Sequence, residues 1–328
     1  MNNEYIITLL ETERLGRVSV NNIIENTKHN VTNLADLLDC IEETSYLNKR
    51  IAVPNLDALK RANDVAQQII DKSIENDIKV IGKGSQNYPK QFLEIANHPV
   101  LIYCKGNLDL LNEYRSVAVI GTREPSNAGK KLGERITEIF VKNNYNIVSG
   151  LAIGCDTIAH KSCLTNNGKT IAVLANGLDY VYPKENCDLA DEIINKDGLI
   201  ISEYPVGRKP MNNFFVERDR LQSGFSQAIC VIETDIKGGT MHTVGFAEKQ
   251  GRLISCINHP EENRNHPKVN GNQMLINSKR AYSLGNPDEI NKFIFDLNNK
   301  VDKAIAFYKT SALLNDKIDN SQLSLDIL

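Results

Sequence analysis

Glycine and hydroxyl residues stand in short runs directly after several apolar segments of this sequence. The runs are Gly121-Thr122-Arg123, Ser149-Gly150-Leu151 with Gly154, Asn176-Gly177, and Gly238-Gly239-Thr240. At a helix N-terminus such residues leave backbone N–H groups free, and these groups bind phosphate or another anion together with the positive helix end. One such loop alone can be an ordinary tight turn. Several in series, with Arg123 beside the first, predict a site for a polyanion.

A second segment, residues 208–226, combines cations with aromatic rings. Its notable residues are Arg208, Lys209, Phe214, Phe215, Arg218, Arg220 and the pair Ser223-Gly224. A guanidinium pairs with phosphate and a phenyl ring stacks on an unpaired base, so this combination suits single-stranded nucleic acid. The structural alternative places both rings in the core and pairs the arginines with Glu217 and Asp219. The segment by itself favours neither interpretation.

Signals for catalysis, cofactors and metals are weak. The dinucleotide fingerprint G-x-G-x-x-G and the P-loop G-x-x-x-x-G-K-[ST] are both missing, which disfavours NAD and a standard ATPase. Asp156 and His160 are one helical turn apart and could share a proton, but no nucleophile or metal-ligand spacing accompanies them. His242, beside Thr240, is a better pocket candidate than the other histidines. We therefore predict no catalytic residue, no metal and no cofactor.

The elements that must position these residues are predicted from hydrophobic periodicity. Apolar, β-branched runs alternate with helix-length segments from Ser116 onward, which predicts a Rossmann-like, doubly wound, mainly parallel α/β sheet over residues 116–290. Ligands of such sheets bind beyond the carboxyl ends of the strands, where the glycine runs stand. Residues 1–75 show three- and four-residue apolar spacing, typical of a small helical domain of the SAM or HhH kind. We expect a connecting, β-containing segment over 76–115, and a peripheral C-terminal tail without a winged helix over 291–328.

Composition limits the class of protein. The 328 residues include 38 basic and 41 acidic side chains, so the net charge is −3. This charge excludes a protein that coats nucleic acid indiscriminately, and any DNA contact must use a local patch. We find no signal peptide and no apolar run near twenty residues. Seven cysteines without a C-x-x-C pair suit reduced thiols, and we expect a cytoplasmic protein.

The order and spacing of these motifs resemble those of the DNA-processing protein A family (DprA, also called Smf) over roughly residues 75–285. The matching motifs are Gly121-Thr122-Arg123, Ser149-Gly150-Leu151-Ala152-x-Gly154-x-Asp156, Gly177-Leu178-Asp179-x-Val181-Tyr182-Pro183, Ser202-Glu203-Tyr204-Pro205, Phe215-x-x-Arg218-x-Arg220, Ser223-Gly224 and Gly238-Gly239-Thr240. The resemblance implies a non-enzymatic, dimeric, Rossmann-like protein that binds single-stranded DNA. It also implies help in loading the recombinase RecA during natural transformation.

The resemblance also assigns roles to residues. Arg123 is expected to contact phosphate, and Phe215, Arg218 and Arg220 are expected to flank the strand. The floor and rim of the same DNA-binding site would comprise Gly121, Thr122, Ser149, Gly150, Leu151, Gly154, Ser223, Gly224, Gly238, Gly239 and Thr240. Two departures reduce the expected positive charge: Ile153 replaces a frequent basic residue, and Asp219 replaces a usual asparagine. The segment 238–243 also departs from the family pattern, which suggests a divergent branch.

Three alternatives stay open. The crevice could bind a nucleotide in an enzyme or sensor, as other Rossmann-like proteins do. A divergent branch could serve in defence against foreign DNA. Finally, the terminal residues 322–327 resemble the short glutamine-leucine peptides that bind the bacterial sliding clamp, which predicts an extended docking tail.

Overall fold

The structure, a computed structural model, describes residues 1–264 and 266–325, with side chains up to residue 308 and at 310. A nine-stranded sheet forms its centre, in the order β1-β2-β6-β5-β4-β3-β7-β8-β9. The strands are β1 Lys79–Gly82, β2 Leu101–Gly106, β3 Ser116–Ile120, β4 Asn146–Ser149, β5 Thr170–Leu174, β6 Leu199–Ser202, β7 Ala228–Val231, β8 Leu253–Ile257 and β9 Tyr282–Leu284. Strands β3 to β9 run parallel, whereas β2 pairs antiparallel with both β1 and β6. The predicted Rossmann-like, mainly parallel sheet is confirmed.

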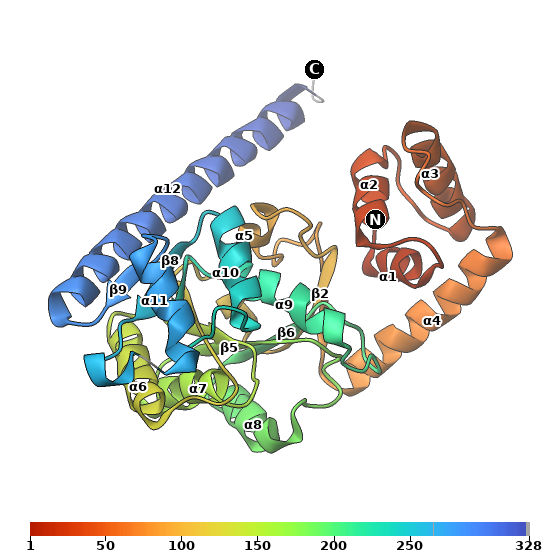
Figure 1. Cartoon of the computed structure of the whole chain (residues 1–328). Coiled ribbons are helices and arrows are strands. Elements are labelled where there is room, and N and C mark those ends of the chain that lie inside the picture. Colours follow the sequence, from red (N-terminus) through yellow and green to blue (C-terminus); the bar gives the residue numbers. More distant parts are fainter. Residues whose placement is uncertain (265, 326–328) are drawn as a thin grey trace.

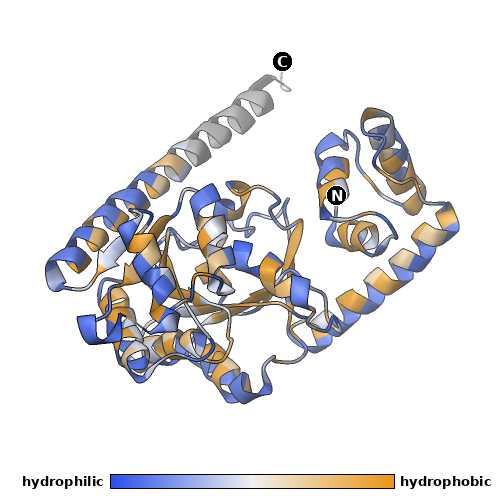
Figure 2. Cartoon of the chain, viewed as in Figure 1, coloured by the Kyte–Doolittle hydropathy of each residue, from blue (hydrophilic) through white to orange (hydrophobic). Residues whose placement is uncertain are grey.

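Helices cover both faces of the sheet (Figure 1). One face carries α6 Asn127–Lys142, α7 Cys155–Thr165, α8 Cys187–Asn195 and the first turns of α12 Pro287–Leu325. The other carries α5 Lys90–Leu93, α9 Asn212–Phe225, α10 Thr240–Lys249 and α11 Asn270–Asn277. Short 3₁₀ turns are η1 Leu108–Asn112, η2 Lys184–Asn186, η3 Glu261–Asn263 and η4 Pro267–Val269. The central strands are accordingly hydrophobic along their length, while the helices alternate apolar and polar positions (Figure 2).

Alternation along the strands divides the core into layers. In β3, Val117 and Val119 pack with α6 and α7, while Ala118 and Ile120 pack with α9 and α10. The period of two follows from the pleat of a strand, which directs successive side chains to opposite faces. Side chains on both faces of the central strands are buried. The polar residues therefore follow the strands, at the carboxyl edge of the sheet.

The N-terminal part is helical, as predicted. It comprises α1 Asn3–Glu11, α2 Arg17–Asn26, α3 Leu34–Leu47 and α4 Leu56–Glu75. Asparagine side chains cap three of these helices, because Asn2, Asn33 and Asn55 each accept hydrogen bonds from first-turn N–H groups.

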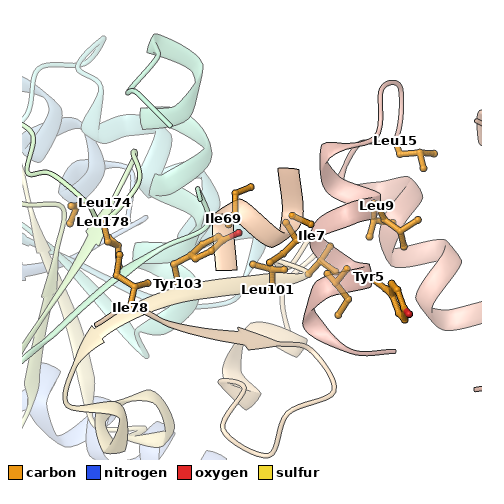
Figure 3. Close-up of a cluster of buried hydrophobic side chains, with 14 of the residues drawn as sticks. Tyr5, Ile7, Leu9, Leu15, Ile69, Ile78, Leu101, Tyr103, Leu174 and Leu178 are labelled. Atoms are coloured by element: carbon orange, nitrogen blue, oxygen red, sulfur yellow. The ribbon is translucent and has the colours of Figure 1, made fainter. Parts of the chain in front are cut away.

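Apolar packing joins these helices to the sheet. Ile7 of α1 and Ile69 of α4 belong to the same buried cluster as Leu101 and Tyr103 of β2, and Figure 3 shows the continuous line of side chains. The cluster continues to Leu174 at the end of β5. The helical part is therefore docked on the β2 side of the sheet by a shared hydrophobic core.

Two further predicted segments also contribute to the fold. The segment 76–115, predicted as a connecting, β-containing segment, supplies β1 and β2 at one end of the sheet. The C-terminal segment is not wholly peripheral, because Phe293, Leu297 and Val301 of α12 are fully buried, and the Phe293 ring packs against Phe140 of α6 and Tyr282 of β9. Their three- and four-residue spacing among polar residues is that of a half-buried helix.

The predicted docking tail lies only partly within the described residues. The backbone of residues 322–325 continues α12 and is helical instead of extended. Residues 326–328 and the side chains of 322–325 lie outside what the structure describes. The predicted clamp contact stays a prediction.

Candidate nucleic-acid interface

A pocket of about 490 Å³ opens at the carboxyl edge of the sheet, between the loops that follow β3 and β7. The order of the parallel strands reverses between these two strands, since β4 lies beyond β3 on one side and β8 beyond β7 on the other. This reversal is the point where doubly wound sheets bind their ligands. Residues from the end of β3, from the loops that follow β3, β4 and β7, and from α7, α9 and α10 meet there.

Arg123 and Phe215 form the accessible part of the pocket wall. Arg123 is exposed, and its Cζ lies 5.4 Å from the centroid of the Phe215 ring. Phe215 is half-buried on the first turn of α9. The guanidinium over the ring is a cation–π contact, which orients Arg123 while leaving its N–H groups free for a ligand. A phosphate binder and a stacking ring are thus adjacent.

Arg218 forms the inner wall and is buried, with 6% of its surface exposed. Its Nη1 donates hydrogen bonds to the carbonyl oxygens of Gly150 and Val173, each at 2.6 Å. Its Nε donates to Asp219 Oδ1 at 3.2 Å. Nη2 makes no hydrogen bond to another described residue, and Arg218 lines the pocket. The side chain is therefore fixed by three bonds and keeps donors for a ligand.

The position of Arg218 explains why residue 150 is a glycine. A Cβ atom on residue 150 would lie 1.9 Å from Arg218 Nη1 and 2.4 Å from its Cζ. The glycine thus creates the room that the guanidinium occupies, and it is not among the residues that line the pocket.

The last of the predicted glycine runs, Gly238-Gly239-Thr240, lies at the pocket. Gly238, Gly239 and Thr240 line it, and α10 begins at Thr240, so the N-terminus of α10 is part of the wall. His242 of the same helix also lines the pocket. A helix N-terminus carries a partial positive charge that favours phosphate.

Two buried carboxylates occupy the anion positions of the other loops. Asp156 accepts hydrogen bonds from the N–H groups of Gly150 and Ala152, at 3.1 and 3.3 Å. Glu233 accepts from the N–H and Oγ of Ser126, at 2.8 and 2.6 Å, at the start of α6. The amides of the second loop, which the sequence suggests for phosphate, are thus already used inside the protein.

The other residues of the second loop are also internal. Ser149 is fully buried and donates from Oγ to the Val119 carbonyl at 2.7 Å. Leu151 is fully buried. Gly154 has a φ of +83°, and a Cβ there would lie 2.4 Å from the Arg123 carbonyl, so it allows the two loops to pack together. These residues hold the Arg123 loop in place and do not line the pocket. Gly121 and Thr122 do line it.

Arg220, Ser223 and Gly224 lie away from the pocket. Arg220 is 3% exposed and donates two hydrogen bonds from Nη2 to Glu203, at 2.8 and 2.6 Å. Ser223 is fully buried and bonds within α9, and Gly224 packs against Ile95. The structure does not bring these three expected DNA contacts to the site, because the period of α9 turns them toward the core.

Arg220 instead joins the α/β unit to the N-terminal helices. Glu203 also binds Arg17 of α2 at 3.1 Å, and Arg17 binds Glu217 at 3.0 Å. The four side chains form one partly buried ion-pair network. Removing one member of such a network leaves charge unpaired in a region of low dielectric.

Arg220→Ala is therefore expected to lower the free energy of unfolding by about 3 kcal/mol without abolishing DNA binding. Urea unfolding should show the loss, and oligo-dT affinity at low denaturant should stay within about twofold, since no contact is lost from the pocket. Arg280→Ala is the matched control, because Arg280 makes a two-bond pair with Glu248 at the surface. That pair should contribute about 1 kcal/mol or less. A large loss of affinity in Arg220→Ala with unchanged stability would restore the DNA-contact role.

Asp219 brings negative charge to the pocket. Its pKa is raised to about 6. Burial is the main cause and the neighbouring Asp156 acts in the same direction, whereas Arg218 lowers the pKa. Burial likewise raises the pKa of Asp156. The carboxyl groups of Asp219 and Asp156 thus both lie near the Arg218 guanidinium. The net charge that a ligand meets in the pocket therefore depends on pH.

The sequence analysis did not single out several lining residues. Gln222, Thr234, Asp235 and Lys268 all contribute to the wall. Lys268 comes from η4 and pairs with Glu124 at 2.6 Å. It stands in an Asn- and Pro-rich segment without periodicity, so no local signal places it at the pocket. His160 is fully buried away from the pocket lining: its Nδ1 lies 2.7 Å from Thr170 Oγ1, and burial lowers its pKa to about 3.

Comparison with known proteins decides the family. Residues 79–295 match the family described as DNA recombination-mediator protein A. The chain belongs to this family. The match begins at β1 and ends in the buried part of α12, so it covers the whole sheet and the pocket. The DprA resemblance carried by the motifs is thereby confirmed.

Individual DprA and Smf proteins support the assignment. The DNA processing protein DprA of Streptococcus pneumoniae is 43% identical over 170 residues, which is 52% of this chain and 59% of that protein. Protein Smf of Synechocystis is 37% identical over 207 residues, 62% of this chain and 52% of that protein. The chain thus spans little more than half the length of these curated relatives.

Solved DprA structures share the fold. The S. pneumoniae crystal structure has a TM-score of 0.73 at 29% identity and covers 89% of this chain and 98% of that one. The Helicobacter pylori protein, whose structure is described for its single-stranded DNA binding mode, has a TM-score of 0.59 at 29% identity. It covers 68% of this chain and 96% of that one.

Two further observations concern the described residues only. None of their helices has both the length and the apolar character needed to cross a membrane. No group of three or more His, Cys, Asp or Glu side chains among them is arranged to hold a metal ion.

Proposed function

We propose that this chain binds single-stranded DNA in the pocket between β3 and β7. One observation carries the proposal: an exposed arginine lies over a half-buried phenyl ring, and both line the same pocket as a buried arginine whose Nη2 has no partner among the described residues. Arg123 and Arg218 would bind successive phosphates, the N-terminus of α10 would add amides, and Phe215 would stack on a base. Single strands fit better than duplex, because a base must be unstacked to reach the ring.

The charge of the whole chain is compatible with this function. A net charge of −3 gives no general attraction to DNA, so binding depends on the few cations of the pocket. Fluorescence anisotropy of a labelled oligo-dT, measured against an equal-length duplex and against dTMP, tests the proposal. Saturable binding of the oligo-dT alone supports it. Strong stabilisation by dTMP with none by the oligonucleotide would favour a nucleotide site instead.

We further propose that the protein acts without catalysis, as a homodimer that helps RecA assemble on incoming single-stranded DNA. This role rests on membership of the recombination-mediator family and on the DNA-binding proposal. It also implies that the protein works in the cytoplasm during DNA uptake. Assembly of a RecA filament on oligo-dT covered with single-strand-binding protein, followed with and without the chain, tests it. An unchanged rate of assembly would contradict the role.

DNA binding should weaken as pH rises through about 6, the range in which Asp219 ionises. The ionised carboxylate repels phosphate and neutralises part of Arg218. Asp219→Asn should flatten this dependence and bind several-fold more tightly at pH 7.5. Anisotropy titrations from pH 5 to 8 at constant ionic strength measure both effects. Asp64→Asn, an exposed site on α4, makes the same charge change away from the pocket and should keep the wild-type profile.

Asp219→Asn should also change the thermal stability of the protein in a pH-dependent way. The pKa of Asp219 is raised by folding, so its protonated form is the one that folding favours, and stability is lost as pH rises through the folded value of about 6. Asp219→Asn should therefore melt higher than wild type at pH 8, with a smaller difference at pH 5. Equal gains at both pH values would contradict the assignment.

A further inference from the structure

We propose that Tyr182 is a second nucleobase-stacking residue, which extends the DNA path from the pocket across Phe215 to the loop that follows β5. This inference rests on the proposed function, since it adds a base-binding position to the same site. The ligand chemistry is an unpaired nucleobase, held by its π-face and not by its edge.

Phe215 contacts both Tyr182 and Arg123. The Tyr182 and Phe215 ring centroids are 5.8 Å apart with an angle of 47° between the rings. Arg123 Cζ lies 5.4 Å from the Phe215 centroid. Phe215 and Arg123 line the pocket, whereas Tyr182 lies outside its lining. A strand that stacks on Phe215 therefore reaches Tyr182 on leaving the pocket.

The Tyr182 side chain is partly exposed to solvent. It is 44% exposed, whereas its neighbour Phe215 is half-buried. A partly exposed aromatic ring gains by covering its free surface with another flat, apolar group. A base supplies that group without any need for sequence readout.

The loop that carries Tyr182 is fixed before any ligand binds. The Gly177 N–H donates to the Arg208 carbonyl at 2.9 Å, and the Tyr180 hydroxyl donates to the same oxygen at 3.2 Å. The Gly207 N–H donates to Asp179 Oδ1 at 2.9 Å. These bonds tie the loop to the segment before α9, so stacking on Tyr182 requires little further ordering of the backbone.

Exposed cations belong to the same two segments. Lys184 follows Tyr182 by two residues, and Lys209 follows the carbonyl that anchors the loop. Both ammonium groups are on flexible stems and can follow a phosphate backbone next to the stacked base. Glu185 is the opposing charge in this stretch, which limits the gain from the two lysines.

A single-tryptophan variant tests the proposal, because the chain contains no tryptophan. In Tyr182→Trp, oligo-dT should quench tryptophan fluorescence with the same dissociation constant that anisotropy of a labelled oligo-dT gives. An abasic oligonucleotide of equal length should bind through its phosphates without quenching. The control is Tyr46→Trp, which places the reporter at a site on α3 that is 82% exposed and should show no quenching.

Affinity measurements complete the test. Tyr182→Ala should weaken oligo-dT binding by about five- to tenfold, the lower range for loss of one stacked base, while Tyr182→Phe should bind as wild type. Normal affinity of Tyr182→Ala, together with no quenching of the Tyr182→Trp variant by bound oligo-dT, would overturn the inference and leave single-stranded DNA binding intact. Absence of oligo-dT binding by the wild type would overturn the proposed function, and this inference with it.

Discussion

Arg123→Glu is expected to weaken oligo-dT binding by about 10- to 100-fold, the factor that follows from losing a charge-assisted hydrogen bond of roughly 1.5–3 kcal/mol. Arg123 is the exposed cation of the pocket, and its neighbours on the wall include the carboxyl groups of Asp219 and Asp235. Reversal of its charge replaces a phosphate donor by a group that repels phosphate. The loss should be similar for oligo-dT and mixed sequences, since phosphate contacts carry no sequence information.

Salt dependence gives an independent measure of the same contact. Each phosphate neutralised on a single strand contributes about −0.7 to the slope of log affinity against log salt concentration. Arg123→Ala should make the slope shallower by about this amount. Arg61→Glu is the matched control, because Arg61 is exposed on α4 and its reversal changes the net charge equally. If Arg61→Glu and Arg123→Glu lose the same affinity, the effect is one of net charge and the assignment of Arg123 is wrong.

Gly150→Ala should disrupt both folding and binding. The added Cβ would lie 1.9 Å from Arg218 Nη1, so the guanidinium must leave its place. Its departure would leave two carbonyl oxygens and the buried Asp156 without a cation, which costs about 3–5 kcal/mol when a buried pair is broken. We expect a decrease in melting temperature of roughly 10 °C. Oligo-dT affinity should also fall, because Arg218 no longer presents Nη2 to the pocket.

A second glycine provides the control for this substitution. Gly245 lies within α10, and a Cβ there would meet no atom within 4 Å. Gly245→Ala should therefore leave DNA binding unchanged and raise stability slightly, since alanine loses less backbone entropy in a helix than glycine does. A Gly150→Ala protein that melts and binds like wild type would show that the interaction of Arg218 with the second loop is not needed.

The sequence predicts the parts of this site that depend on local pattern. Apolar, β-branched runs that alternate with helical segments predict the parallel sheet. Because ligands of such sheets bind beyond the carboxyl ends of the strands, the sequence also predicts that Arg123 and the Gly238–Thr240 loop lie at the same edge. Phe215 and Arg218 are assigned by the family resemblance, because the segment 208–226 by itself favours neither a DNA contact nor a core position. The family resemblance, carried by motifs with fixed order, supplies the nature of the ligand.

The errors concern contacts between residues far apart in the sequence. Arg220 is predicted as a phosphate contact, but its partner Glu203 comes from the loop after β6 and binds Arg17, 186 residues away. The second glycine loop is predicted to bind phosphate, but Asp156 turns back to accept its amides. Glycine and arginine are needed equally for close packing and for anion binding, so residue type alone does not separate the two roles. The buried turns of α12 were missed for a similar reason, since a mostly polar helix shows its apolar stripe only against a partner.

A crystal structure of the protein with a short oligo-dT would show whether single-stranded DNA occupies the pocket between β3 and β7. We expect phosphate oxygens within about 3 Å of Arg123 and of Arg218 Nη2, the usual distance of a charge-assisted hydrogen bond. One base should lie against Phe215 and the next against Tyr182. An oligonucleotide bound elsewhere, with the pocket between β3 and β7 empty, would contradict the account.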